Sequence, residues 1–149
     1  SVAVLTIGWA TPAALGVALA APGRRVLLFT GEGSHQLTAQ EIGQFGRLGL
    51  KPIVFVLNNG GYLIERLLNR DPAIAYNDVA AWRYHQLPHA LGCDGWFTAR
   101  VASCGELDAA LQQAAAADGG VYIEVMTAAD AASPLARRLG DGLKTLRRA

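Results

Sequence analysis

The feature that most constrains the fold is a pair of short apolar segments, each followed directly by a turn of small and polar residues. Val26–Thr30 leads into Gly31–Ser34, and Pro52–Leu57 leads into Asn58–Gly61. Short apolar runs that end in glycine-rich turns are typical of buried strands. We therefore expect two neighbouring strands of one sheet, each with a polar turn at its carboxyl end.

The remaining elements predict an α/β protein with a parallel sheet and helices on both faces. We expect helices at Thr11–Ala21, Thr38–Leu48, Tyr62–Leu68, Arg83–Leu91 and Glu106–Ala117, and further strands at Trp96–Val101 and Val121–Met126. Strands that alternate with helices along a chain favour parallel pairing. All 149 residues are expected to form one domain with a buried core.

Residue types at the helix ends predict specific caps. Thr11 before Pro12 predicts an N-cap, and Thr38 with Glu41 has the spacing of a capping box. Gly49 stands where a C-terminal cap is expected.

The C-terminal segment, residues 133–149, is predicted to form a helix with a stripe of leucines flanked by basic residues. This helix either packs on its own domain or forms a lid over a site. The leucines of the stripe are Leu135, Leu139, Leu143 and Leu146.

Composition excludes several classes of function. The formal net charge of +1 gives no basic surface for nucleic acid or an acidic membrane. The apolar stretch Ala10–Ala21 is too short to span a bilayer, and Ser1–Ile7 lacks the basic start of a signal peptide. Cys93 and Cys104 lack C-x-x-C spacing, which favours a reducing cytoplasm, although one buried disulfide between them remains an alternative. We therefore expect a soluble, cytoplasmic protein.

The two turns carry the chemistry of a magnesium-bound diphosphate site. Because neighbouring parallel strands bring their carboxyl ends together, the two turns should form one site. Glu32 and the asparagine amides offer oxygen ligands for a hard cation, and glycine backbone N–H groups suit an anion.

The segment from Gly31 to Glu65 also resembles the cofactor segment of a known enzyme family. Gly31-Glu32-Gly33, followed one strand–helix–strand step later by Asn58-Asn59, resembles the thiamine-diphosphate motif, Gly-Asp-Gly with a later Asn-Asn pair. Gly61-Tyr62, with Glu65 three residues on, is particular to the pyruvate, indolepyruvate and phenylpyruvate decarboxylases. The resemblance runs from about Ile7 to the end of the chain and implies the C-terminal thiamine-diphosphate-binding domain of such an enzyme.

The resemblance implies a role for each matching residue in binding thiamine diphosphate and magnesium (Mg2+). The side chains of Glu32 and Asn59 and the carbonyl of Gly61 would bind the metal. The diphosphate would lie against the turn formed by Gly31, Gly33 and Ser34, which supplies N–H and hydroxyl donors.

Three further residues would act on the reacting part of the cofactor and on a 2-oxo acid substrate. Ile7 would be the apolar wedge that bends the cofactor, and Ile64 would line the substrate pocket. Glu65 would transfer protons during non-oxidative decarboxylation to an aldehyde.

The chain departs from the family pattern in three ways. Glu32 stands where Asp is usual, and Leu5 stands where Gly is usual. Family members also have a pyrimidine-binding domain that activates the cofactor, and this chain lacks both that domain and the first strand and helix of its own. The chain alone is therefore expected to be inactive and to work with the pyrimidine-binding domain in a homodimer or homotetramer.

Alternative interpretations remain for the whole chain and for single residues. The chain can be a non-catalytic fragment or an assembly or cofactor-binding module, whereas a nucleotide-binding domain is disfavoured because G-x-G-x-x-G and a P-loop lysine are absent. His85 and His89 have the spacing of a metal pair but no third ligand, which favours a structural role. Arg66 is expected to be solvated, and His35 either supports the phosphate turn or belongs to the core.

Overall fold

Four parallel strands form the centre of the molecule in the computed structural model, which describes residues 7–69, 71 and 73–146. They lie in the order β1 (Leu27–Gly31), β2 (Ile53–Asn58), β4 (Val121–Met126) and β3 (Phe97–Val101). Each neighbouring pair is parallel, as predicted. Leu5 lies outside the described residues.

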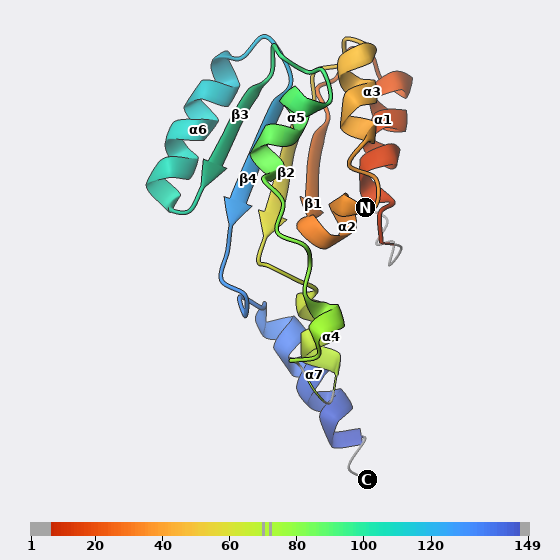
Figure 1. The fold of residues 1–149 in the computed structure, drawn as a ribbon, viewed down its shortest axis with the longest axis vertical. Coiled ribbons are helices and arrows are strands. Elements are labelled where there is room, and N and C mark those ends of the chain that lie inside the picture. Colours follow the sequence, from red (N-terminus) through yellow and green to blue (C-terminus); the bar gives the residue numbers. More distant parts are fainter. Residues whose placement is uncertain (1–6, 70, 72, 147–149) are drawn as a thin grey trace.

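Helices cover both faces of this sheet (Figure 1). On one face, α1 (Ala10–Ala20) and α3 (Glu41–Arg47) pack against a core that includes Val54 and Tyr122. On the other face, α6 (Cys104–Ala116) covers a second core that includes Ile123. The predicted fold class, α/β with helices on both faces, is confirmed.

The remaining helical elements are short, apart from the last one. They are α2 (Glu32–Gln36), α4 (Leu63–Leu68), η1 (Ala75–Asn77), η2 (Tyr84–Gln86), α5 (Leu87–Ala90) and α7 (Pro134–Leu146). Among the described residues, no helix combines the length and apolarity that a membrane span requires.

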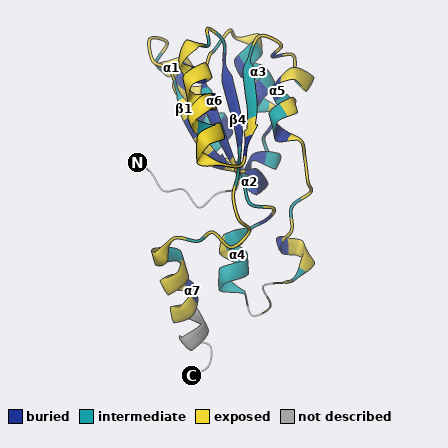
Figure 2. Cartoon of the chain, turned by 90° about the vertical axis from the view of Figure 1, so that its left-hand side faces the viewer, coloured by how far each residue is buried: buried dark blue, intermediate teal, exposed yellow. Residues whose placement is uncertain are grey.

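The predicted C-terminal helix is present as α7 and lies beside α4, beyond the carboxyl ends of the strands (Figure 1). Gly140 allows the close approach, because a Cβ atom there would lie 3.0 Å from the Leu67 carbonyl oxygen. The outer surface of α7 is exposed, including Leu135 and Leu139 of the leucine stripe (Figure 2). The side chains of Leu143 and Leu146 lie outside the described part. A lid role for α7 stays a prediction.

Two predicted helix caps are wrong because tertiary contacts use the hydroxyl groups. Helix α1 begins at Ala10, and Thr11 Oγ1 lies 3.0 Å from His35 Nδ1 inside the core. Helix α3 has no side-chain cap at its start, and the Thr38 hydroxyl instead donates to the Gly8 carbonyl at 2.8 Å.

Two other helix ends follow from local sequence. Gly49 has φ +66°, and the N–H groups of Gly49 and Leu50 donate to the Gly46 and Phe45 carbonyls, which is a Schellman motif. The predicted C-terminal cap is thus confirmed. A capping box that the sequence analysis missed joins Ser103 and Glu106 at the start of α6.

His35 belongs to the core and joins three elements. The ring is fully buried, with Nδ1 near Thr11 of α1 and Nε2 2.8 Å from the Tyr122 hydroxyl of β4. Because burial disfavours the charged imidazolium, the pKa of His35 falls from 6.5 to about 4. The neutral ring therefore holds α2 against the sheet.

The buried His35 should make stability depend on pH. Below its unfolded pKa of 6.5 the unfolded chain binds a proton that the folded chain excludes until about pH 4, so stability falls as the pH drops through this window. The full loss is about 3 kcal/mol at 1.36 kcal/mol per pKa unit. Urea denaturation of the wild type and His35→Gln at pH 7 and pH 4.5 should show the smaller pH dependence in the variant. Equal pH dependence in the two proteins would contradict this account.

Candidate functional site

The site lies at the carboxyl ends of β1 and β2, where parallel pairing places the two polar turns side by side. Gly31 pairs with Leu57, the last residue before Asn58. The expected Gly31–Ser34 turn is in fact the start of a short helix, because α2 begins at Glu32, directly after the strand. Glu32 thereby turns back toward the second strand.

All nine predicted site residues line one cavity of about 430 Å³. They are Ile7, Gly31, Glu32, Gly33, Ser34, Asn59, Gly61, Ile64 and Glu65. Five further lining residues were not predicted: Leu57, Tyr62, Leu63, Thr127 and Ala131. Thr127 directly follows β4, which pairs with β2 in parallel. Because ligands bind at the carboxyl ends of neighbouring parallel strands, the strand prediction could have indicated this residue as well.

Three oxygen-bearing groups converge inside this cavity. The Glu32 side chain is buried, and its Oε1 accepts the Gly61 N–H at 2.7 Å. The terminal amide of Asn59 lies 3.0 Å from Glu32 Oε1 and 2.8 Å from the Gly61 carbonyl oxygen. With its nitrogen inward, this amide donates to both oxygens. With Oδ1 inward, three oxygens face one another, as a hard cation requires.

The second turn is held by Arg66, which the sequence analysis wrongly assigned to solvent. Its guanidinium donates to the Gly60 carbonyl at 2.9 Å and to Asp78 Oδ1 at 2.8 Å, and only 19% of the side chain is exposed. Gly61 also forms a bridge with Asp78. These long-range contacts fix a turn that needs positive φ at Gly60 (73°) and Gly61 (155°).

The first turn is packed tightly against the second. The Tyr62 hydroxyl donates to the Gly33 carbonyl at 3.1 Å, and its ring lies over the Gly33 Cα. The Gly8 N–H donates to Ser34 Oγ at 2.8 Å, so the Ser34 hydroxyl hydrogen is left to donate elsewhere.

The residues predicted to act on the reacting part of a ligand lie at the rim. Glu65 and Ile64 are on α4, and Ile7 precedes α1. Glu65 is half-buried, whereas Ile64 and Ile7 are 45% and 50% exposed. Within the described residues, the inner end of the cavity thus carries the buried Glu32, and its outer end, lined by Ile7, Ile64 and Glu65, is more open to solvent.

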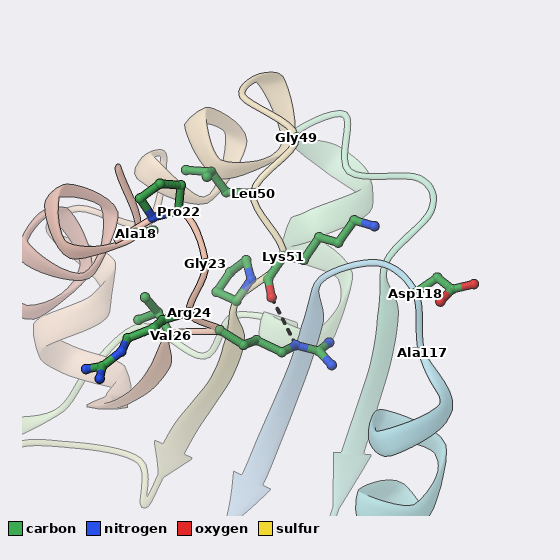
Figure 3. A pocket seen from close by; sticks show the side chains of 12 residues that line it. Ala18, Pro22, Gly23, Arg24, Val26, Gly49, Leu50, Lys51, Ala117 and Asp118 are labelled. Carbon is green, nitrogen blue, oxygen red and sulfur yellow. Dashed lines mark hydrogen bonds between the residues drawn. The ribbon is translucent and has the colours of Figure 1, made fainter. Parts of the chain in front are cut away.

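A cavity of about 350 Å³ at the opposite ends of the strands has different chemistry (Figure 3). Arg25 there donates to the carbonyl oxygens of Lys51 and Gly119. Arg25 thus satisfies two carbonyl groups from loops that precede strands, which gives it a structural role.

Each histidine of the predicted pair contacts a different carboxylate. His85 Nδ1 lies 2.7 Å from Glu124, and His89 Nδ1 lies 2.7 Å from Asp94. Among the residues that the structure describes, no group of three or more His, Cys, Asp or Glu side chains is placed to hold a metal.

Comparison with known proteins identifies the family. Residues 1–125 match the family model for the thiamine pyrophosphate enzyme C-terminal TPP-binding domain, thiamine pyrophosphate (TPP) being another name for thiamine diphosphate. The chain belongs to this family. The resemblance predicted from the two turns is thereby confirmed.

Individual relatives agree with the family assignment. The chain is 46% identical over 122 residues to an alpha-keto-acid decarboxylase from Mycolicibacterium paratuberculosis and 45% identical over 122 residues to one from Mycobacterium tuberculosis. Each match covers 81% of this chain and 22% of the relative, so the chain spans about a fifth of the length of these curated relatives.

A solved structure is similar as well. An X-ray structure of a protein from Mycobacterium smegmatis, described as a "putative thiamin diphosphate-dependent enzyme", matches with a TM-score of 0.66 at 27% identity. The match covers 83% of this chain and 22% of that one.

The tight packing at Gly33 gives a test of the site geometry. An alanine Cβ there would lie 2.6 Å from Tyr62 Cε1, closer than real contacts allow, whereas a Cβ at Gly31 meets nothing within 4 Å. Gly33→Ala should therefore destabilise the chain by about 1–3 kcal/mol in urea denaturation. The matched variant Gly31→Ala should change stability by less than about 1 kcal/mol. Equal effects of the two substitutions would show that Tyr62 does not pack as described.

Proposed function

We propose that this chain is the part of a 2-oxo acid decarboxylase that binds thiamine diphosphate and magnesium. The observation that carries this proposal is the convergence of nine motif residues on one cavity whose inner end holds three oxygen-bearing groups. The family match supports the binding of thiamine diphosphate, and the names of the relatives support the decarboxylase activity.

The inner end of the cavity fits a metal-bound diphosphate. The Glu32 carboxylate, Asn59 Oδ1 and the Gly61 carbonyl would hold magnesium, which prefers oxygen ligands shared with ligand phosphates. Gly31, Gly33 and Ser34 line the same wall and would bind the diphosphate through N–H and hydroxyl donors.

The replacement of the usual Asp by Glu32 is compatible with this role. The longer side chain reaches the second turn, where Oε1 accepts the Gly61 N–H, and remains buried beside the Asn59 amide. Glu32 therefore joins the two turns as well as supplying a charge for the metal.

The outer residues would control the reaction. When bound, thiamine diphosphate supplies the electron sink for decarboxylation. Ile7 would press on the cofactor and hold it bent, while Ile64 would contact the side chain of the 2-oxo acid. Glu65 would hold and move a proton at the reacting carbon, for which its position on the cavity wall is suited.

The open outer end of the cavity suggests that other parts of the protein complete it. The exposed Ile7 and Ile64 and the half-buried Glu65 leave this end accessible to water. A pyrimidine-binding domain, in a homodimer or homotetramer, would cover it and exclude water. On this proposal the chain alone does not turn over substrate.

Cofactor binding is tested by thermal and urea denaturation of this chain in magnesium, with and without thiamine diphosphate. Ligand at about 100 times Kd should add about 2.7 kcal/mol of stability. Glu32→Ala should abolish this gain, whereas Glu65→Gln should keep it, because Glu65 lines the outer end of the same cavity. A gain that survives Glu32→Ala would contradict the proposed metal site. If the wild type shows no gain, the assay is repeated with the pyrimidine-binding domain added.

The role of Glu65 is tested by turnover. The assay uses a decarboxylase polypeptide that contains this chain together with the pyrimidine-binding domain, called the longer protein below. In it, Glu65→Gln should keep cofactor affinity and slow 2-oxo acid decarboxylation by about 10²–10⁴-fold, the range typical of a lost proton-transfer group. A rate within threefold of the wild type would exclude Glu65 from proton transfer.

A further inference from the structure

A buried carboxylate outside the predicted motif lies behind the second turn. Glu124 is in the middle of β4, paired with Val56 on one side and Arg100 on the other, and its side chain is only 2% exposed. A carboxylate in such a position is costly unless hydrogen bonds satisfy it. Its contacts therefore indicate what it holds in place.

Both Glu124 oxygens are engaged by groups from other segments. Asn58 Nδ2 donates to Oε1 at 2.8 Å. The His85 backbone N–H donates to Oε2 at 3.3 Å, and His85 Nδ1 lies 2.7 Å from the same atom. Arg100 Nε is 3.8 Å from Oε1 on a half-exposed side chain. Glu124 thus joins η2 to the start of the Asn58–Gly61 turn.

The bond to Glu124 fixes which way the Asn58 amide points. With Nδ2 toward Glu124, Asn58 Oδ1 faces the turn and accepts the Gly60 N–H at 3.2 Å. The Asn58 carbonyl accepts the Thr127 N–H at 2.9 Å. Asn58 is therefore held at both its side chain and its backbone, and through Gly60 it sets the direction of the next residues.

The Asn58–Gly61 turn depends on such hydrogen bonds because a second cavity lies beside it. Asn58, Asn59 and Gly60 line this second cavity of about 740 Å³, which shares Glu32, Asn59 and Thr127 with the predicted cofactor cavity. Glu124 and His85 line this second cavity too. The turn thus borders both cavities, and the hydrogen bonds of Asn58 to Glu124 and Gly60 help to hold its position.

We propose that Glu124, supported by His85, is a positioning residue that holds the Asn58–Gly61 turn so that Asn59 and Gly61 face Glu32. This inference rests on the proposed function, since it concerns the metal ligands of that site. Among the described residues, the side chain of Glu124 makes its polar contacts with Asn58, His85 and Arg100, so it acts on Asn59 and Gly61 through Asn58 and Gly60. Its removal should weaken metal-dependent cofactor binding beyond any effect on stability.

The test measures Mn2+ binding in the presence of thiamine diphosphate. Electron paramagnetic resonance reports the concentration of free Mn2+. The measurement is made on this chain of 149 residues and on the longer protein. Glu124→Met keeps the side-chain length but removes both acceptors. It should raise the Mn2+ concentration for half-saturation at least tenfold. Glu124→Gln keeps one acceptor for Asn58 Nδ2 and should stay within threefold of the wild type.

Two further variants separate positioning from stability. Glu106→Met removes another carboxylate that accepts backbone N–H groups, those of Ala102 and Ser103 at the start of α6. It should lower the melting temperature but leave Mn2+ binding unchanged. Asn58→Ala cuts the same bond at its other end and should weaken binding as much as Glu124→Met; it replaces that variant if Glu124→Met does not fold.

The outcomes are distinct. The inference is supported if the wild type binds Mn2+ and only Glu124→Met and Asn58→Ala bind it more weakly. Wild-type binding with no weakening in these variants, or with equal weakening in Glu106→Met, overturns it while leaving the proposed function intact. Absence of Mn2+ binding by the longer wild-type protein overturns the proposed function and the inference with it.

Discussion

The hydrogen bond between the Glu32 carboxylate and the Gly61 N–H joins the ends of two strands, and the site depends on it. Parallel pairing of β1 and β2 brings the two turns close, but strand pairing alone does not orient their side chains. The buried carboxylate reaches across this gap at 2.7 Å and brings Asn59 and the Gly61 carbonyl within reach of the same point. Burial strengthens this contact, because no water competes for the carboxylate oxygen.

Two sets of long-range contacts support that geometry from outside. Arg66 ties the Gly60 carbonyl to Asp78, and Glu124 orients Asn58 at the other end of the same turn. Beyond the end of β1, His35 of α2 holds that helix to the sheet through Tyr122. Arg66, Glu124 and His35 do not line the cofactor cavity, yet they hold in place the residues that do.

The sequence was most informative where function restricts residue type over a short span. Strand ends, glycine turns and the family resemblance from Ile7 onward led to nine of the fourteen residues that line the cavity. The sequence was least informative where a side chain can form a hydrogen bond either with its own helix or with a distant segment. Thr11 and Thr38 have the local pattern of helix caps, yet they bond His35 and the Gly8 carbonyl. Arg66 and Glu124 gave no local signal, since their partners lie on other elements.

The measurement that tests the account most directly is a crystal structure of the longer protein grown with thiamine diphosphate and Mn2+ in place of magnesium. The account predicts one anomalous peak within coordination distance of a Glu32 carboxylate oxygen, Asn59 Oδ1 and the Gly61 carbonyl oxygen, with the diphosphate against Gly33 and Ser34. A metal bound elsewhere, or a diphosphate that does not contact these two turns, would contradict it.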